Sequence, residues 1–180
     1  MDLFYVNNGC LSLGLSFGIT MRPVVQLERT GCGIASVAAI AGLSYGSAKM
    51  IANSLGIHAA DKALWSDTSH VRQLLRHFGF ASPRERPFRS WGSLPDLALL
   101  STKWHLEQGR PYWHWVVFVR ERGFAYVLDS NKSLRNNRRT DFGRIKPKWF
   151  IPVTHTRQYL SESTAGRRSI VAAREAGSAE

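Results

Sequence analysis

The sequence predicts a single α+β domain, on three observations. Its 180 residues match the length of one domain, and a hydrophobic content of 44% is enough to form a core. The first half contains helix-like segments that end at glycines, whereas the second half is rich in β-branched and aromatic residues with short turns between them. Helices followed by antiparallel strands are typical of an α+β architecture.

Three helices are expected in the first half. The run 33–41 is rich in Ala with Ile and Val, which suits a helix buried on all sides, and Gly42 ends it. Ser47 is the expected N-cap of a second helix over 48–55. Thr68 is the expected cap of a third helix. The apolar face of that third helix consists of Val71, Leu74, Leu75 and Phe78.

Strands are expected after the arginine-rich loop 83–92. They cover 97–104, 112–121, 124–130 and part of 146–154. Pro152 lacks a backbone N–H and therefore places the last of these strands at an edge of the sheet.

The domain is expected to span residues 21–155. Residues 1–20 are expected to be disordered or to lie upstream of a true start at Met21, because Asp2 and the lack of a preceding Lys or Arg argue against a signal peptide. The segment 156–180 is expected to be a flexible polar tail. No run of about 18 apolar residues occurs, so no membrane-spanning helix is predicted.

The formal net charge of +11 favours contact with anionic surfaces, nucleic acid among them. The basic segment, residues 132–148, holds seven Lys or Arg and one acid, Asp141. It is either a solvated loop or a surface that steers an anionic partner towards a site.

Two cysteines support neither a disulfide framework nor a zinc site of the CxxC type, and no motif predicts a metal or a cofactor. Free thiols in the cytoplasm are the simpler interpretation. Export as an effector without a recognisable signal peptide is the alternative.

The motif GCGIASVAAIAG places Cys32 between two glycines at the start of the predicted buried helix. Unpaired N–H groups at a helix N-terminus favour an anion, which makes a cysteine there a candidate thiolate nucleophile. Glycine on both sides is expected to let the backbone turn tightly and the substrate approach. The alternative is a small buried hydrophobic residue, because a nucleophile also needs a base and an orienting group.

His114 is the expected base among six histidines, because it opens the most apolar strand, in PYWHWVVF. Trp113 and Trp115 flank it and are expected to form walls of a peptide cleft. His70 and His77, on the third helix, are expected at the surface because seven residues is not a metal-binding spacing.

Asp129 is expected to orient the imidazole of His114, with Asn131 as the alternative. Asp129 ends the strand that follows, and a turn centred between Glu121 and Arg122 pairs position 114 with position 129.

Gln26 lies six positions ahead of Cys32. Its neutral side-chain amide is a suitable donor to an oxyanion, together with the N–H of the nucleophile itself.

These motifs resemble the C39-like cysteine peptidases, a papain-like family known best from the bacteriocin-processing domains of ABC exporters. GCGIASVAAIAG and HWVVF…VLDS carry the resemblance, which covers residues 24–152. It implies a papain-like fold with N-terminal helices packed on a C-terminal antiparallel sheet. It further implies Cys32 as nucleophile, His114 as base, Asp129 as orienting group and Gln26 in the oxyanion hole.

The sequence departs from the family at two positions, each adjacent to a predicted catalytic residue. The family usually has an acidic residue before the cysteine and a proline after the aspartate, where this chain has Gly31 and Ser130. The expected function is a cysteine peptidase that hydrolyses a peptide or amide bond of a peptide or protein through a thioester. The alternatives are another acyl-transfer enzyme (a deamidase, transglutaminase or amidase), or an idle module that binds an anionic partner such as nucleic acid.

Overall fold

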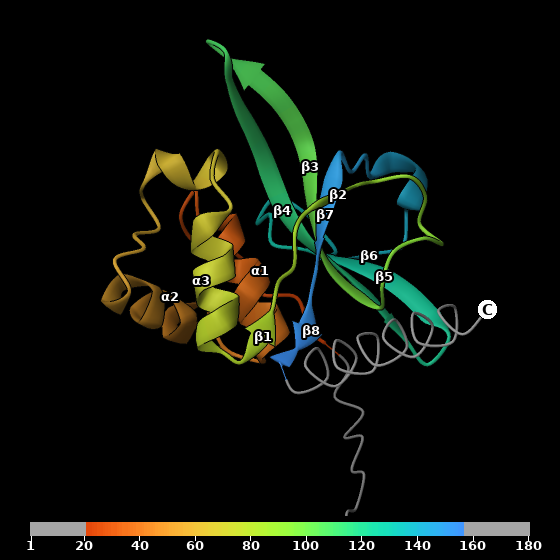
Figure 1. Cartoon of the computed structure of the whole chain (residues 1–180), viewed down its shortest axis with the longest axis horizontal. Coiled ribbons are helices and arrows are strands. Elements are labelled where there is room, and N and C mark those ends of the chain that lie inside the picture. Colours follow the sequence, from red (N-terminus) through yellow and green to blue (C-terminus); the bar gives the residue numbers. More distant parts are fainter. Residues whose placement is uncertain (1–20, 157–180) are drawn as a thin grey trace, which may run out of the picture.

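A computed structural model describes residues 21–156 of the chain, and Figure 1 shows its arrangement. The expectations for residues 1–20 and for the C-terminal tail lie outside the described residues. The helices of the described part are α1 Cys32–Ala41, α2 Tyr45–Ser54, α3 Ser69–His77 and two 3₁₀ turns, η1 Lys62–Trp65 and η2 Phe142–Arg144. The longer strands are β3 Leu97–Glu107, β4 Arg110–Glu121, β5 Phe124–Asp129 and β7 Trp149–Pro152. The two-residue strands are β1 Phe80–Ala81, β2 Arg86–Pro87, β6 Arg138–Arg139 and β8 Thr154–His155.

The α-helices lie on one side of the molecule and the strands on the other, which agrees with the α+β class (Figure 1). The main sheet has the order β2-β7-β3-β4-β5-β6, and every neighbouring pair in it is antiparallel. β1 and β8 form a separate antiparallel pair. None of the described helices alone is long and apolar enough to cross a membrane, although α1 and α2, bent by 111° at their junction, pass that test as a pair.

Helix α1 forms as expected, and nine of its ten residues are buried. It packs against β4 on one side and against α2 and α3 on others. The main core therefore lies between the helices and the sheet. A second, smaller core covers the opposite face of the sheet and contains Leu94, Ala98, Leu100, Val116, Phe118, Val127, Ile145 and Phe150.

The predicted start of the second helix is wrong by one turn. The helix begins at Tyr45, and Ser44 is its cap, with an extended backbone and a side-chain oxygen that accepts from the N–H of Ser47. Two serines three residues apart both fit the N-cap pattern, and the one that takes the extended conformation becomes the cap.

The prediction of an edge position for the last strand is also wrong, because β7 lies between β2 and β3. Pro152 is tolerated there because β2 pairs only with Trp149 and Phe150. The strand therefore has no partner on that side at Pro152, while Ala98 is its register partner on the other side.

The hairpin of β3 and β4 is longer than expected and projects beyond the rest of the sheet (Figure 1). Its two-residue turn is Gln108–Gly109, with φ angles of 50° and 79°, which is the backbone that a tight hairpin needs. The outer part, residues 103–110, is exposed, and it follows an irregularity in which Lys103 has a φ angle of 52° and the register shifts between Thr102 and His105.

The two glycines beside Cys32 are required by packing. Gly31 has φ −77°, an ordinary angle for any residue, so the expected special turn is absent. A Cβ at Gly31 would lie 2.0 Å from the hydroxyl of Tyr45, and a Cβ at Gly33 would lie 2.4 Å from Nε2 of His70. His70 is 3% exposed, which corrects its expected surface position, and its imidazole lies against helix α1.

We predict that Gly33→Ala lowers the free energy of unfolding by about 1–3 kcal/mol, because the added methyl group meets His70 and Val71 in a closed core. Gly46→Ala in α2 is the control, since its Cβ would meet no atom closer than 3.9 Å. Alanine is the better helix former, so this variant should gain up to about 1 kcal/mol. Chemical denaturation of both variants measures the difference, and equal stabilities would contradict the packing explanation.

Candidate active site

The structure brings three of the four predicted site residues together around one imidazole. Cys32 is the first residue of α1, His114 lies in β4 and Asp129 ends β5. Nε2 of His114 lies 2.7 Å from Oδ1 of Asp129. The side chain of Cys32 also interacts with the His114 side chain, and this interaction raises the pKa of the imidazole. His114 is therefore the middle member of a Cys–His–Asp arrangement.

The predicted register between β4 and β5 is wrong by two residues, because Val116, not His114, pairs with Asp129. The central turn residues are Arg122 and Gly123, with φ angles of 51° and 80°, so the hairpin is centred one residue later than expected. His114 and Asp129 are therefore diagonal neighbours on adjacent strands, a separation that a histidine and a carboxylate can span.

Asp129 is held on both carboxylate oxygens. Oδ1 accepts from the N–H of Asn131 (3.1 Å) as well as facing His114, and Oδ2 accepts from Nη1 of Arg139 (3.1 Å). The rest of the Arg139 guanidinium forms a two-pronged ion pair with Asp141, at 2.9 and 2.8 Å. Asn131, the alternative orienting residue, contributes its backbone to the carboxylate of Asp129 and does not replace it.

These contacts change the charge states of His114 and Asp129. Burial alone would lower the pKa of His114, but the hydrogen bonds with Asp129 and Cys32 outweigh it and raise that pKa to about 9. Burial alone would raise the pKa of Asp129, but His114, the N–H of Asn131 and Arg139 lower it to about 2. At neutral pH the site therefore contains an imidazolium beside a carboxylate.

Gln26 is close to the site but is engaged elsewhere. It is 9% exposed, and its amide Nε2 donates to the carbonyls of Glu28 (3.0 Å) and Arg29 (2.9 Å). Ser130 anchors it, since its hydroxyl donates to Oε1 of Gln26 (2.8 Å) and its carbonyl accepts from the Gln26 N–H (3.0 Å). Both hydrogens of the amide are thus used within the segment that precedes α1, and the oxyanion role of Gln26 stays a prediction.

Glu28 connects this segment to helix α2. Its carboxylate accepts from the hydroxyl of Tyr45 and forms an ion pair with Lys49. Although burial alone would raise it, the pKa of Glu28 is lowered by these two partners. The hydroxyl of Tyr45 occupies the space where a Cβ at Gly31 would lie. The resemblance predicts an acidic side chain at position 31, beside Cys32. In this chain the hydroxyl of Tyr45, which donates to Glu28, occupies that place.

A cleft of about 520 Å³ lies beside the imidazole. Its walls are the segment 26–29, Trp65, the outer part of the β3–β4 hairpin and the segment 131–133, and His114 and Trp113 line it. Cys32 is 0% exposed and is not part of the lining. Trp115 is also 0% exposed, so it belongs to the core and its prediction as a cleft wall is wrong.

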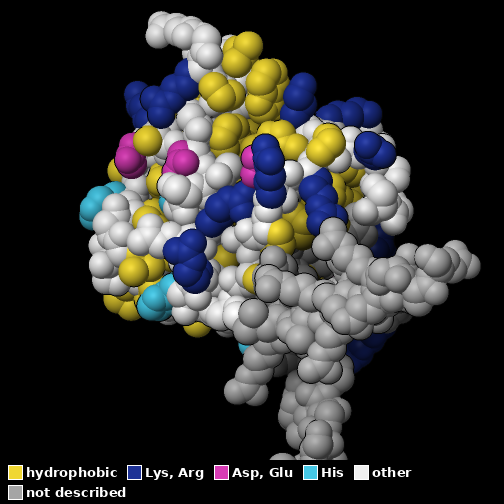
Figure 2. Space-filling model, in the orientation of Figure 1, with side chains coloured by type: hydrophobic (Ala, Val, Ile, Leu, Met, Phe, Trp, Pro, Cys, Tyr) yellow, Lys and Arg dark blue, Asp and Glu magenta, His cyan; other side chains and the backbone are white. Residues whose placement is uncertain are grey.

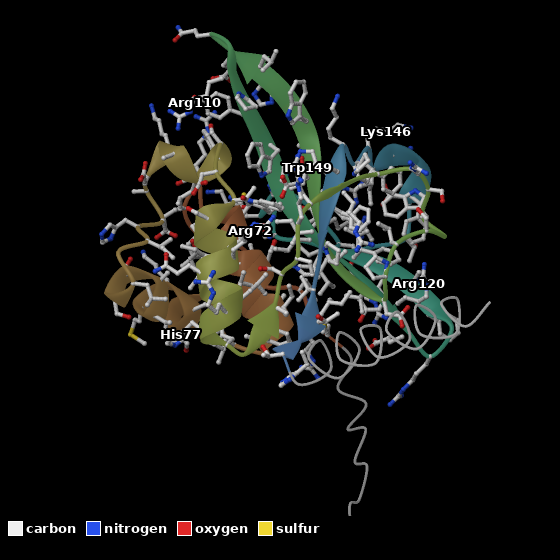
Figure 3. The ribbon with its side chains drawn as sticks, in the orientation of Figure 1. Arg72, His77, Arg110, Arg120, Lys146 and Trp149 are labelled. Carbon is white, nitrogen blue, oxygen red and sulfur yellow. The ribbon has the colours of Figure 1, made fainter. Side chains whose placement is uncertain are left out.

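Both Trp113 and Trp115 pack edge-to-face on Trp149, with ring centroids 5.2 Å apart in each pair. Trp149 lies on β7 near the centre of the molecule (Figure 3). The three rings form one aromatic cluster that supports the strand carrying His114.

Sequence reasoning missed Arg139, Ser130 and Tyr45. Arg139 is one of seven cations in the basic segment, and no pattern separates it from its neighbours. Ser130 could have been suspected, because it replaces a family proline directly after Asp129. Within residues 21–156, no group of three or more His, Cys, Asp or Glu is arranged to hold a metal ion.

Comparison with known proteins shows similarity in fold. No family model and no curated protein matches the chain. Among solved structures, a double glycine motif protease from an AMS/PCAT transporter, in complex with the leader peptide, is similar to this chain with a TM-score of 0.51 and 16% sequence identity. The alignment covers 76% of this chain and 93% of that chain. At this identity the similarity shows a shared fold and nothing beyond it.

We predict that Arg139 and Asp141 set the pKa of His114 in opposite directions. Arg139→Met removes a cation near the imidazolium and should raise that pKa by roughly half a unit, whereas Asp141→Asn leaves Arg139 unbalanced and should lower it by a similar amount. NMR titration of the His114 ring measures both shifts.

Arg138→Met is the matched control, because the Arg138 guanidinium lies over the ring of Tyr126, 3.8 Å from its centroid. It should leave the titration of His114 unchanged. Shifts of the same sign in the Arg139 and Asp141 variants would indicate general loosening of the site and contradict the electrostatic explanation.

Proposed function

We propose that this protein is a cysteine peptidase that hydrolyses a peptide or amide bond through a thioester on Cys32. The observation that carries the proposal is the His114 side chain, which is hydrogen-bonded to Asp129 and interacts with Cys32 at the edge of a cleft of about 520 Å³. The similarity in fold to a double glycine motif protease supports it, because a cysteine nucleophile, a histidine base and a third residue that orients the base serve that chemistry.

The proposed reaction begins with attack of the Cys32 thiolate on the carbonyl carbon of the scissile amide. The carbonyl π electrons move to oxygen, and the N–H of Cys32 at the start of α1 donates to that oxyanion. Gln26 joins as a second donor when its amide releases the carbonyl of Glu28 or Arg29. The thiol must also become accessible through motion of the free protein, since Cys32 is 0% exposed.

The tetrahedral intermediate then collapses to an acyl thioester. Protonated His114 gives its proton to the leaving amine as the C–N bond breaks. Neutral His114 next takes a proton from water, whose oxygen attacks the thioester carbonyl. The acid leaves, the C–S bond breaks, and the thiolate and imidazolium are restored. Asp129, ionised and held by Asn131 and Arg139, stabilises the imidazolium throughout.

The first substrates to test are peptides that contain a double-glycine motif, since the structural neighbour is a double glycine motif protease bound to a leader peptide. Deamidation, amide hydrolysis and transglutamination use the same thioester and are separated by product mass. Hydrolysis of the backbone gives two peptides, whereas transfer from a side-chain amide to an amine adds the mass of the amine less that of the ammonia released. Action in the cytoplasm is part of the proposal, and fractionation of cells tests it.

We predict that iodoacetamide labels Cys32 fast between pH 5 and pH 8, and that His114→Ala slows this labelling at least about tenfold, because the imidazolium stabilises the thiolate. Peptide mapping by mass identifies the modified cysteine. His77→Ala is the control, since His77 is exposed on α3 away from the cleft. Slow labelling that is the same in all three proteins would mean that Cys32 is a packed core residue, and the proposal would fail.

We predict that peptidase activity is lost as the pH rises through about 9. The leaving amine needs a proton from His114, whose pKa is raised to about 9, so the protonated form is present below that pH and disappears above it. The same imidazolium contributes stability that is fully present below the unfolded pKa near 6.5 and lost through pH 9. A pH profile of kcat/KM measures this loss of activity at alkaline pH. Full activity at pH 10 would exclude His114 as the acid.

A further inference from the structure

The cleft beside His114 carries charge on several of its walls. The segment before α1 contributes Glu28 and Arg29, β3 contributes Lys103, His105 and Glu107, and the segment after β5 contributes Lys132. Figure 2 shows that Lys and Arg side chains are spread over the face it displays, with few acidic side chains among them. The partners of each charged group decide what this cleft offers to a ligand.

Both carboxylates in the cleft lining already have partners. Glu28 forms an ion pair with Lys49 and accepts from the hydroxyl of Tyr45. Glu107 lies 3.2 Å from Nε2 of His105, and the carbonyl of Lys103 together with Glu107 raises the pKa of that histidine. A ligand therefore meets no carboxylate in the lining that lacks a partner.

The cations of the lining are not balanced in the same way. Arg29, Lys103 and Lys132 are exposed, and among residues 21–156 none of them forms an ion pair with a carboxylate. The guanidinium of Arg29 lies over the ring of Trp65, 5.3 Å from its centroid, so it is held at the wall. Three positive groups thus surround a concave site from three different segments, an arrangement that attracts anions into it.

Three other cations of the basic segment have partners outside the cleft. Arg139 is bound to Asp129 and Asp141, Arg138 lies over Tyr126, and Lys148 lies over Trp104. Of this segment only Lys132 and Ser133 line the cleft. The attraction of an anion to the site therefore depends on the cleft cations and not on the segment as a whole.

We propose that the cleft selects an acidic peptide, with Asp or Glu side chains flanking the scissile bond paired to Lys103 and Lys132. The inference rests on the proposed function in taking a peptide as the ligand. A peptide is favoured over nucleic acid because the aromatic faces in the cleft are covered: Trp65 by Arg29, and Tyr112 by the stacked ring of His105, 5.8 Å away. Bases bound to single-stranded sites stack on free aromatic faces.

The test measures binding apart from catalysis. A full-length Cys32→Ser protein is titrated by calorimetry with two decapeptides centred on Gly-Gly, one with Glu at the flanking positions and one with Gln. At low salt the Glu peptide should bind about five- to tenfold more tightly, and 0.5 M NaCl should remove most of the difference, because exposed pairs are weak individually and screened by salt.

A Lys103→Gln, Lys132→Gln double variant should bind both peptides equally. Arg29 is left in place because it also packs on Trp65. The matched control is Arg76→Gln with Arg84→Gln, two exposed arginines that do not line the cleft, and it should retain the preference. Equal binding of the two peptides, no binding of either, or a preference that survives the double lysine variant would each overturn the proposal.

A twelve-residue oligothymidylate serves as the competing anion. If it binds more tightly than the Glu peptide and loses affinity in the lysine variant, the cleft is a nucleic-acid site and the peptide proposal is wrong. Failure of the peptidase proposal is recognised separately, by slow alkylation of Cys32 in the unmodified protein. An acidic preference found together with slow alkylation would leave the cleft as an acidic-peptide site without catalysis.

Discussion

Helix α1 has almost no exposed surface, and this constraint organises the rest of the structure. Nine of its ten residues are buried, so it must be enclosed by the sheet on one side and by α2 and α3 on others. Such close enclosure requires glycine at positions 31 and 33, where Tyr45 and His70 approach the backbone. Cys32 is thereby fixed at the start of the helix, within hydrogen-bonding contact of His114 on β4.

The sheet supplies the other half of the site through the ends of its strands. Asp129 ends β5, and the edge strand β6 brings Arg139 to its second oxygen. Alternating charges therefore run from the imidazolium of His114 through Asp129 and Arg139 to Asp141. This chain of ion pairs stabilises the imidazolium without requiring a deeply buried isolated charge, which would be costly.

The elements that could be predicted are those whose pattern is local. The apolar run of α1, the third helix and the strand ending at Asp129 agree with the structure within a residue or two. Thr68 precedes the third helix as predicted, but its side chain makes no capping hydrogen bond, and Asp67 accepts from the N–H of Ser69. Two-residue strands such as β6 have no local pattern and exist only through their partners, so they were not predictable. The register error arose because Glu121–Arg122 and Arg122–Gly123 both offer a turn, and the glycine position decides between them.

The sequence by itself was enough to predict the candidate site residues and the order in which they occur, because Cys32 and Asp129 lie at the ends of strongly patterned elements and His114 lies in the most apolar strand. The tertiary structure decided what each of them touches. Ser130 hydrogen-bonds to Gln26, 104 positions away, and Tyr45 hydrogen-bonds to Glu28, 17 positions away. Arg139 is one of seven cations in the basic segment, and the pairing of β6 with β5 is what places it beside Asp129. Contacts between distant segments depend on packing and register, and no spacing along the chain encodes them.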